Sequence, residues 1–131
     1  MRILIVEDEE LQRDVLAAQV AGWGHEVATA ATGEEALSAA AAEGFDLLLL
    51  DVYLPDATAV ELIPRLRGLG ASAPVITLTG QSSRELERRL RELGIAYYMA
   101  KPVDAVELRS ILEHMGRPAA RQRPQGALPV C

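Results

Sequence analysis

Four consecutive leucines followed by an aspartate, at positions 47–51, constrain the fold of this chain more than any other feature. Successive side chains of a strand point to opposite faces, so four leucines in a row leave neither face to water. The run therefore predicts a strand that is buried on both faces, as in a parallel sheet covered by helices. A carboxylate is costly in a dry core, but at the carboxyl end of such a strand it reaches the crevice where open α/β sheets bind ligands. Asp51 is thus the first candidate functional residue, although an aspartate there could also simply start the turn at 54–56.

Short apolar runs and helical patterns alternate along the rest of the chain. Runs of β-branched and other apolar residues predict strands, and apolar residues at helical spacing that end at glycines predict helices. Because each strand is followed by a helix, we expect a doubly wound α/β fold, in which a five-stranded parallel sheet has five helices on its two faces. The expected strands are 2–6, 25–30, 47–51, 74–79 and 95–100, and the expected helices are 9–23, 32–43, 59–69, 82–93 and 104–115.

Local signals add detail to three of these helices. Thr32 with Glu35, and Ser82 with Glu85, have the spacing of a capping box, which predicts that each pair begins a helix. Asp104 is expected to open the last helix. In the first helix, one set of apolar residues at helical spacing is expected to face the core, namely Leu11, Val15, Ala18 and Trp23.

The length and charge of the chain limit what it can be. Its 131 residues fit one domain, expected at 1–117, and the Arg-, Gln- and Pro-rich segment 118–131 is expected to be a disordered tail or the start of a linker. The net charge of -6 argues against binding to nucleic acid, so a protein partner is expected. There is no apolar run of membrane-spanning length and no secretory signal, and Cys131 is the single cysteine, so we expect a cytoplasmic chain.

Polar residues follow four of the expected strands at the same edge of the sheet. Three carboxylates meeting there would repel one another unless a divalent cation lay between them. Mg²⁺ suits such a cluster because it prefers carboxylate, carbonyl and water oxygens, and the backbone carbonyl of Tyr53 is well placed to add one. The alternative for the first two acids is an ordinary acidic first turn of a helix. The strand-end residues are Glu7, Asp8, Asp51, Thr79 and Lys101.

Lys101 is the single lysine of the chain, and every other cationic side chain, histidine aside, is arginine. An ammonium is a compact point charge that can follow a phosphoryl oxygen or a carboxylate, whereas a guanidinium is a planar fork. The composition therefore suggests that this strand end needs an ammonium. Thr79 would add a hydroxyl beside the same group, although threonine is also common in strands for packing reasons.

These residues resemble the receiver domain of two-component response regulators, the CheY-like family. The resemblance covers about residues 1–116 and implies a flavodoxin-like sheet with strand order 2-1-3-4-5. It rests on spaced motifs that occur in the family's order, namely Glu7-Asp8, Asp51 followed by Pro55, Thr79-Gly80, and Tyr98 before Lys101-Pro102.

The resemblance also implies a function. Asp51 would accept a phosphoryl group from a phosphohistidine of a sensor histidine kinase or a histidine phosphotransfer protein, forming an aspartyl phosphate. Mg²⁺ would be held by Glu7, Asp8, Asp51 and the Tyr53 carbonyl, while Thr79 and Lys101 would contact the phosphoryl oxygens. Tyr98 would be the switch residue that, with Thr79, changes a protein-binding face made by 82–93, 95–100 and 104–115. The chain would then be a signalling switch rather than an enzyme, with a downstream target protein.

Two alternatives come from other functional classes. A receiver-like interaction module that works without phosphorylation would usually lack some of the site residues, and all are present here. An enzyme of the same fold is less compatible with the sequence. A flavodoxin needs a hydroxyl- and glycine-rich phosphate loop after the first strand, where this chain has acids, and a haloacid-dehalogenase-type phosphatase needs a second Asp where Tyr53 follows Asp51.

Overall fold

The computed structural model describes residues 1–116, and these form one five-stranded parallel sheet with the strand order β2-β1-β3-β4-β5. Strands and helices alternate without exception along the described chain, as expected from the sequence. The expected tail at 118–131, with Cys131, lies outside the described residues. The elements are β1 (Arg2–Val6), α1 (Glu10–Gly22), β2 (Glu26–Ala30), α2 (Gly33–Ala42), β3 (Leu47–Asp51), α3 (Ala59–Gly68), β4 (Val75–Thr79), α4 (Arg84–Glu92), β5 (Tyr97–Ala100) and α5 (Ala105–Met115).

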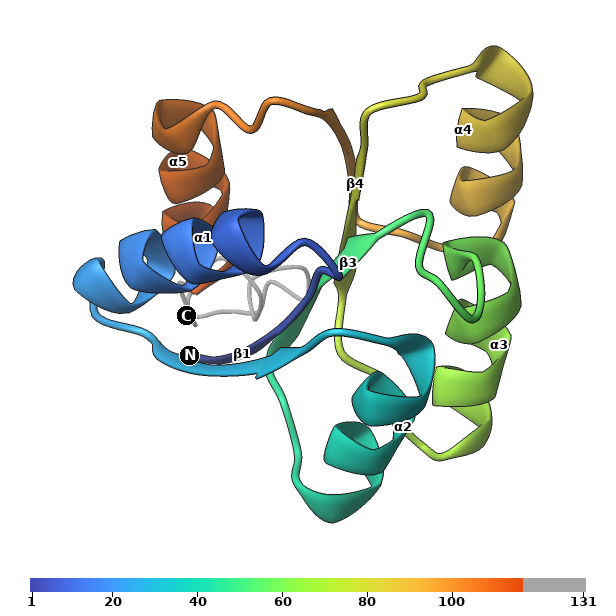
Figure 1. The fold of residues 1–131 in the computed structure, drawn as a ribbon, viewed down its shortest axis with the longest axis horizontal. Helices are drawn as coiled ribbons and strands as arrows, with labels where there is room; N and C mark the ends of the chain where they lie inside the picture. The colour runs from blue at the N-terminus through green and yellow to red at the C-terminus, as the bar shows by residue number, and fades with distance from the viewer. Residues whose placement is uncertain (117–131) are drawn as a thin grey trace, which may run out of the picture.

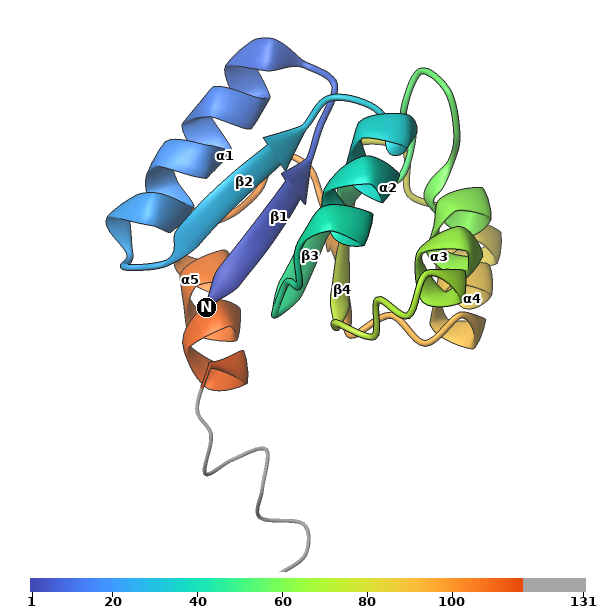
Figure 2. The same ribbon diagram turned by 90° about the horizontal axis from the view of Figure 1, so that it is seen from below.

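Helices cover both faces of the sheet (Figure 1). Figure 2 shows α1 and α5 on one face and α2, α3 and α4 on the other. The leucine run divides between these two layers, because Leu48 and Leu50 pack in the core cluster of α2 to α4, and Leu47 and Leu49 pack in that of α1 and α5. Every residue of β3 is buried, as predicted, so the strand that carries Asp51 lies at the centre of the molecule.

The first turns of the helices differ in part from the capping signals of the sequence. Thr32 caps α2 as predicted, with its hydroxyl accepting from the amide of Glu35 at 3.1 Å. The predicted cap at Ser82 is wrong by one residue, because Ser83 accepts from the amide of Leu86 at 3.0 Å. A complete capping box that the sequence reading missed joins Thr58 and Glu61 at the start of α3.

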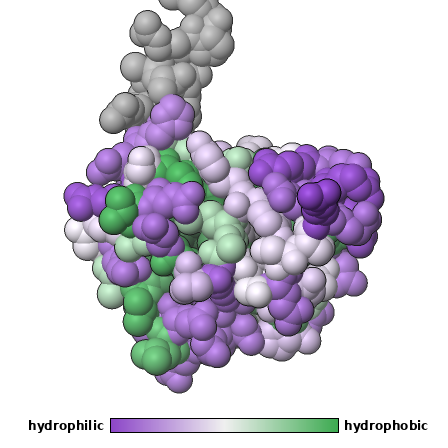
Figure 3. Space-filling view, turned by 90° about the horizontal axis from the view of Figure 1, so that it is seen from above, coloured by the Kyte–Doolittle hydropathy of each residue, from purple (hydrophilic) through white to green (hydrophobic). Residues whose placement is uncertain are grey.

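The apolar face predicted for α1 is wrong for all its residues except Trp23, which packs, partly buried, against the core cluster of α1 and α5. Leu11 is 74% exposed and Val15 is 49% exposed, whereas Leu16 and Val20 are buried against the sheet. The helix carries two apolar stripes, and packing against β1 and α5 selects the one that contains Leu16 and Val20. Figure 3 shows apolar surface on the α1 and α5 side of the molecule and strongly hydrophilic surface on the α4 side. No helix in the described part of the chain combines the length and apolarity needed to cross a membrane.

Candidate functional site

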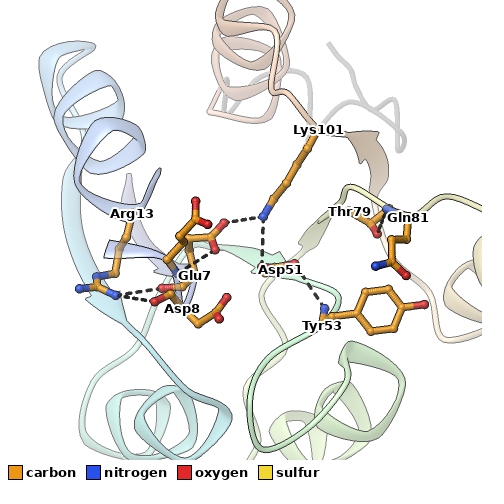
Figure 4. A network of polar contacts seen from close by, with 9 residues as sticks. Glu7, Asp8, Arg13, Asp51, Tyr53, Thr79, Gln81 and Lys101 are labelled. Carbon is orange, nitrogen blue, oxygen red and sulfur yellow. Dashed lines mark hydrogen bonds and ion pairs between the residues drawn. The ribbon is translucent and has the colours of Figure 1, made fainter. Parts of the chain in front are cut away.

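The residues that the sequence analysis singled out meet at the carboxyl edge of the sheet. Glu7 follows β1, Asp51 ends β3, Thr79 ends β4 and Lys101 follows β5, so four strands contribute to one place. Glu7, Asp51 and Thr79 are buried, with 2%, 6% and 0% of their surface exposed, and Asp8 is exposed. Buried ionisable groups need partners, and Figure 4 shows Lys101 reaching toward Glu7 and Asp51, whereas Thr79 lies beside Gln81 on the loop after β4.

The three carboxylates form a group that could hold a metal ion. Glu7, Asp8 and Asp51 each offer an oxygen, and these oxygens all lie within 4.8 Å of one another. Two ligands on opposite sides of one Mg²⁺ are about 4.2 Å apart, so the cluster matches the size of such an ion with small adjustments. The donor set is made of carboxylate oxygens alone, which suits a hard cation rather than zinc or copper. The residues present therefore fit Mg²⁺.

Lys101 lies between two of the carboxylates. Its Nζ is 2.6 Å from Oε1 of Glu7 and 3.1 Å from Oδ2 of Asp51. Burial by itself would lower the pKa of Lys101, but the hydrogen bonds to Glu7 and Asp51, together with their charges, outweigh it and raise the pKa. The ammonium is therefore fully charged at neutral pH and already contacts the carboxylate of Asp51 (Figure 4).

Backbone hydrogen bonds fix the segments that carry these side chains. The amide of Glu7 donates to the carbonyl of Ala30 at 3.0 Å, and the amide of Lys101 donates to the carbonyl of Thr79 at 2.8 Å. These bonds extend the sheet pairing one residue beyond the ends of β1 and β5. Arg13, from the first turns of α1, donates to the carbonyls of Glu7 at 3.1 Å and Asp8 at 3.5 Å. Arg13 was not predicted from the sequence, where the one signal for it is that Arg13 is the only cation within α1.

The backbone after Asp51 turns back on itself within a few residues. The amide of Tyr53 donates to Oδ1 of Asp51 at 3.3 Å, and Tyr53 forms an isolated antiparallel bridge with Thr58. The Tyr53 side chain is 45% exposed, and its ring extends from the Asp51 side of the site toward Gln81 (Figure 4).

The two residues assigned to switching are close in the sheet but do not bond to each other. The hydroxyl of Thr79 accepts from the amide of Gln81 at 3.0 Å, on the loop after β4. Tyr98 packs against the core cluster of α2 to α4, and its hydroxyl is buried without a hydrogen-bond partner among the described residues. A buried hydroxyl without a partner is destabilising, so this conformation of Tyr98 carries a cost.

Replacing Tyr98 with phenylalanine is therefore expected to leave the unmodified protein as stable as before or to raise its free energy of unfolding by about 1 kcal/mol. Urea unfolding followed by circular dichroism measures this. Tyr97→Phe, at the preceding residue of β5, is the matched control. A clear loss of stability in Tyr98→Phe alone would mean that the hydroxyl has a partner.

The fold and its edge cluster define a class of protein, namely α/β domains with acids directly after β1 and at the end of β3 and a lysine directly after β5. The chain belongs to the response regulator receiver domain family, whose model matches residues 3–113. This confirms the family expected from the sequence motifs, and the strand order confirms the expected fold class.

Individual relatives agree with this family. The chain is 32% identical over 111 residues to the transcriptional regulatory protein ZraR of Escherichia coli. The aligned region covers 85% of this chain and 25% of ZraR. A receiver domain protein of Methanospirillum hungatei has a TM-score of 0.82 at 32% identity, covering 95% of this chain and 98% of that one.

A response regulator of Burkholderia pseudomallei, solved with a phosphorylated aspartic acid and a calcium ion, has a TM-score of 0.77 at 29% identity, covering 92% of this chain and 68% of that one. The chain spans 12% of one further curated relative and 46% of another. This chain therefore corresponds to only a part of those longer proteins.

Proposed function

We propose that this receiver domain is controlled by phosphorylation of Asp51. The observation that carries the proposal is the contact of the buried Asp51 carboxylate with Lys101 Nζ at 3.1 Å, inside a cluster of acids of the size of a Mg²⁺ site. A buried carboxylate with one cation beside it and room for another is suited to accept an anionic group. The phosphorylated aspartic acid and the calcium ion in the Burkholderia pseudomallei regulator support the same chemistry here.

Each site residue has a separate part in this proposal. An oxygen of Asp51 attacks the phosphorus of a phosphohistidine, and as the new phosphorus–oxygen bond forms, the phosphorus–nitrogen bond breaks and its electron pair returns to the imidazole. Glu7, Asp8, Asp51 and the backbone carbonyl of Tyr53 would hold Mg²⁺. When bound, Mg²⁺ neutralises charge on the transferred group. Lys101 follows a phosphoryl oxygen by moving from its carboxylate partners.

Phosphorylation would then act on the conformation of the loops around the site. A new dianionic group at Asp51 offers Thr79 and Lys101 a partner that neither has in the unmodified protein. If the hydroxyl of Thr79 leaves the amide of Gln81, the backbone after β4 is released from one of its contacts. The hydroxyl of Tyr98, which has no partner within the part of the chain that the structure describes, would then find one in the rearranged loop. This would bias the face made by α4, β5 and α5 toward a target protein.

The expected partners are proteins. The phosphodonor would be a sensor histidine kinase or a histidine phosphotransfer protein of a phosphorelay, and the output would pass to a downstream target protein. We propose that the domain extends over 1–117, that it acts in the cytoplasm, and that it does not itself bind nucleic acid, in keeping with its net charge of -6. In this role it is a signalling switch that takes part in its own phosphorylation and slow dephosphorylation rather than an enzyme.

The test is phosphorylation of the purified protein by phosphoramidate or acetyl phosphate, with and without Mg²⁺, read by intact mass. We expect a Mg²⁺-dependent gain of one phosphoryl group in the wild type. Asp51→Asn should show none, because an amide is not a nucleophile at phosphorus. A folded wild-type protein that gains nothing would contradict the proposal and favour an interaction module that works without phosphate.

A further inference from the structure

The loop that follows Asp51 is tied to the start of α2, an element far from it in sequence. Oδ1 of Asp56 accepts from the amide of Gly33 at 2.8 Å, and Oδ2 accepts from the amide of Glu34 at 3.0 Å. These amides lie in the first turn of α2, so they have no acceptor within the helix, and the helix dipole also favours an anion at this end. From the sequence alone, Asp56 has no predicted role beyond its place in the turn at 54–56.

The space around Gly33 and the charge of Asp56 both suit this contact. A Cβ atom added to Gly33 would lie 3.3 Å from Oδ1 of Asp56 and 3.5 Å from the Cβ of Ala57, so a larger residue would press on the carboxylate. The amides of Gly33 and Glu34 lower the pKa of Asp56, and the charge of Arg65 adds to this. Asp56 is therefore ionised at neutral pH, in the form that accepts both hydrogen bonds.

The same loop is also closed at its base, next to the site. The amide of Ala59 donates to the carbonyl of Val52 at 2.8 Å, and the amide of Leu54 donates to that of Ala57 at 3.0 Å. The Tyr53–Thr58 bridge joins its two sides. The loop is thus held at its base by its own backbone and at its tip by Asp56, which leaves Tyr53 between two fixed points.

We propose that Asp56 is a positioning residue for the metal and phosphoryl site, acting through the loop that carries Tyr53. The proposal rests on the proposed function above, because it concerns how the Tyr53 carbonyl is presented to Mg²⁺. A loop that is already ordered loses less conformational freedom when one of its carbonyls binds an ion. If the tip of the loop were released, Mg²⁺ binding would have to order the loop as well. Part of the binding free energy would be lost to this ordering, so Mg²⁺ would bind more weakly.

The experiment compares Asp56→Ala with Thr32→Ala, which removes a different hydrogen bond from the first turn of the same helix. Calorimetric titration of each variant with Mg²⁺ gives the affinity, and hydrogen exchange gives the mobility of the loop. We expect Asp56→Ala to weaken Mg²⁺ binding roughly 3- to 10-fold, less than the loss of a direct partner of a metal ligand. Amide exchange over 52–58 should become faster, and Thr32→Ala should change neither property.

A second readout separates positioning from general damage. In Asp56→Ala, the slow phosphorylation by phosphoramidate at low Mg²⁺ should return to within about twofold of the wild type at saturating Mg²⁺, because the lost step is binding. Asp56→Asn keeps one carbonyl oxygen and should lie between the wild type and the alanine variant. It serves as the test variant if Asp56→Ala does not fold.

The outcomes distinguish this proposal from the one it rests on. If the wild type binds Mg²⁺ and both Asp56 variants bind it equally well, then Asp56 only caps α2 and the positioning role is overturned. If the wild type itself neither binds Mg²⁺ nor gains a phosphoryl group, the proposed function fails and this inference fails with it. Weaker binding in Asp56→Ala together with unchanged binding in Thr32→Ala supports the proposal.

Discussion

Replacing Lys101 with methionine is expected to lower the free energy of unfolding by roughly 3 kcal/mol in the absence of Mg²⁺. The reason is that Glu7 and Asp51 are buried, and Lys101 is the cation that contacts both of them. Without it, two neighbouring carboxylates are left in a poorly solvated place, where like charges repel. Methionine has a similar length, so little packing is lost.

Divalent cations should reverse most of this loss. Mg²⁺ would supply the missing positive charge, and it would no longer compete with the ammonium, so we expect Lys101→Met to bind Mg²⁺ more tightly than the wild type. Phosphorylation should nevertheless be slower by about 100-fold, since a cation beside the transferred group is gone. Tighter binding combined with slower transfer would separate the role of Lys101 from that of the acids.

Thermal unfolding with and without Mg²⁺, together with the phosphoramidate assay, measures both effects. Arg109→Met is the matched control, because Arg109 pairs with Glu113 at 3.3 Å while both side chains are more than half exposed. Exposed pairs of this kind contribute between about 0 and 1 kcal/mol. Equal stability of Lys101→Met and the wild type without Mg²⁺ would show that the two carboxylates do not need the ammonium.

Replacing Leu50 with alanine is expected to cost between about 2 and 5 kcal/mol of unfolding free energy, because it leaves a cavity beside the last residue of β3. Leu50 is fully buried in the cluster of α2, α3 and α4 and pairs with Val6 and Thr77 of the neighbouring strands. For a domain of this size the melting temperature should fall by roughly 7 to 18 °C.

Leu69→Ala gives the comparison for this prediction. Leu69 follows α3 and is 51% exposed, so its replacement should cost less than about 1 kcal/mol. Chemical unfolding of the two variants beside the wild type measures the difference. Similar losses for Leu50→Ala and Leu69→Ala would contradict the description of β3 as the centre of the core.

The sequence was sufficient for the order and type of all ten elements in the described chain, but less so for helix starts and faces. In α1 the stripe through Leu11 and Val15 and the stripe through Leu16 and Val20 have the same spacing, so periodicity alone could not choose between them. Ser82 and Ser83 are likewise adjacent serines before one helix, and only the backbone conformation selects Ser83 as the cap.

The candidate site divides in the same way. Glu7, Asp8, Asp51, Thr79 and Lys101 could be named because the carboxyl ends of parallel strands share one edge. Arg13 and Asp56 were not predicted, because both bond to backbone groups: Arg13 to carbonyls just before α1, and Asp56 to amides at the start of α2. A pattern of side-chain types says nothing about which backbone carbonyl or amide a side chain reaches.

What the sequence determined by itself was a parallel sheet with a cluster of acids and one ammonium at its edge. The leucine run requires a strand that is buried on both faces. Because a carboxylate is costly inside such a core, the aspartate that ends the strand has to lie at the edge of the sheet. Only the tertiary structure decided the contacts among these groups, namely those of Lys101 with Glu7 and Asp51 and that of Asp56 with the start of α2. It also decided that the hydroxyl of Tyr98 is buried without a hydrogen-bond partner among residues 1–116. These depend on distances between elements, which packing sets and local sequence does not.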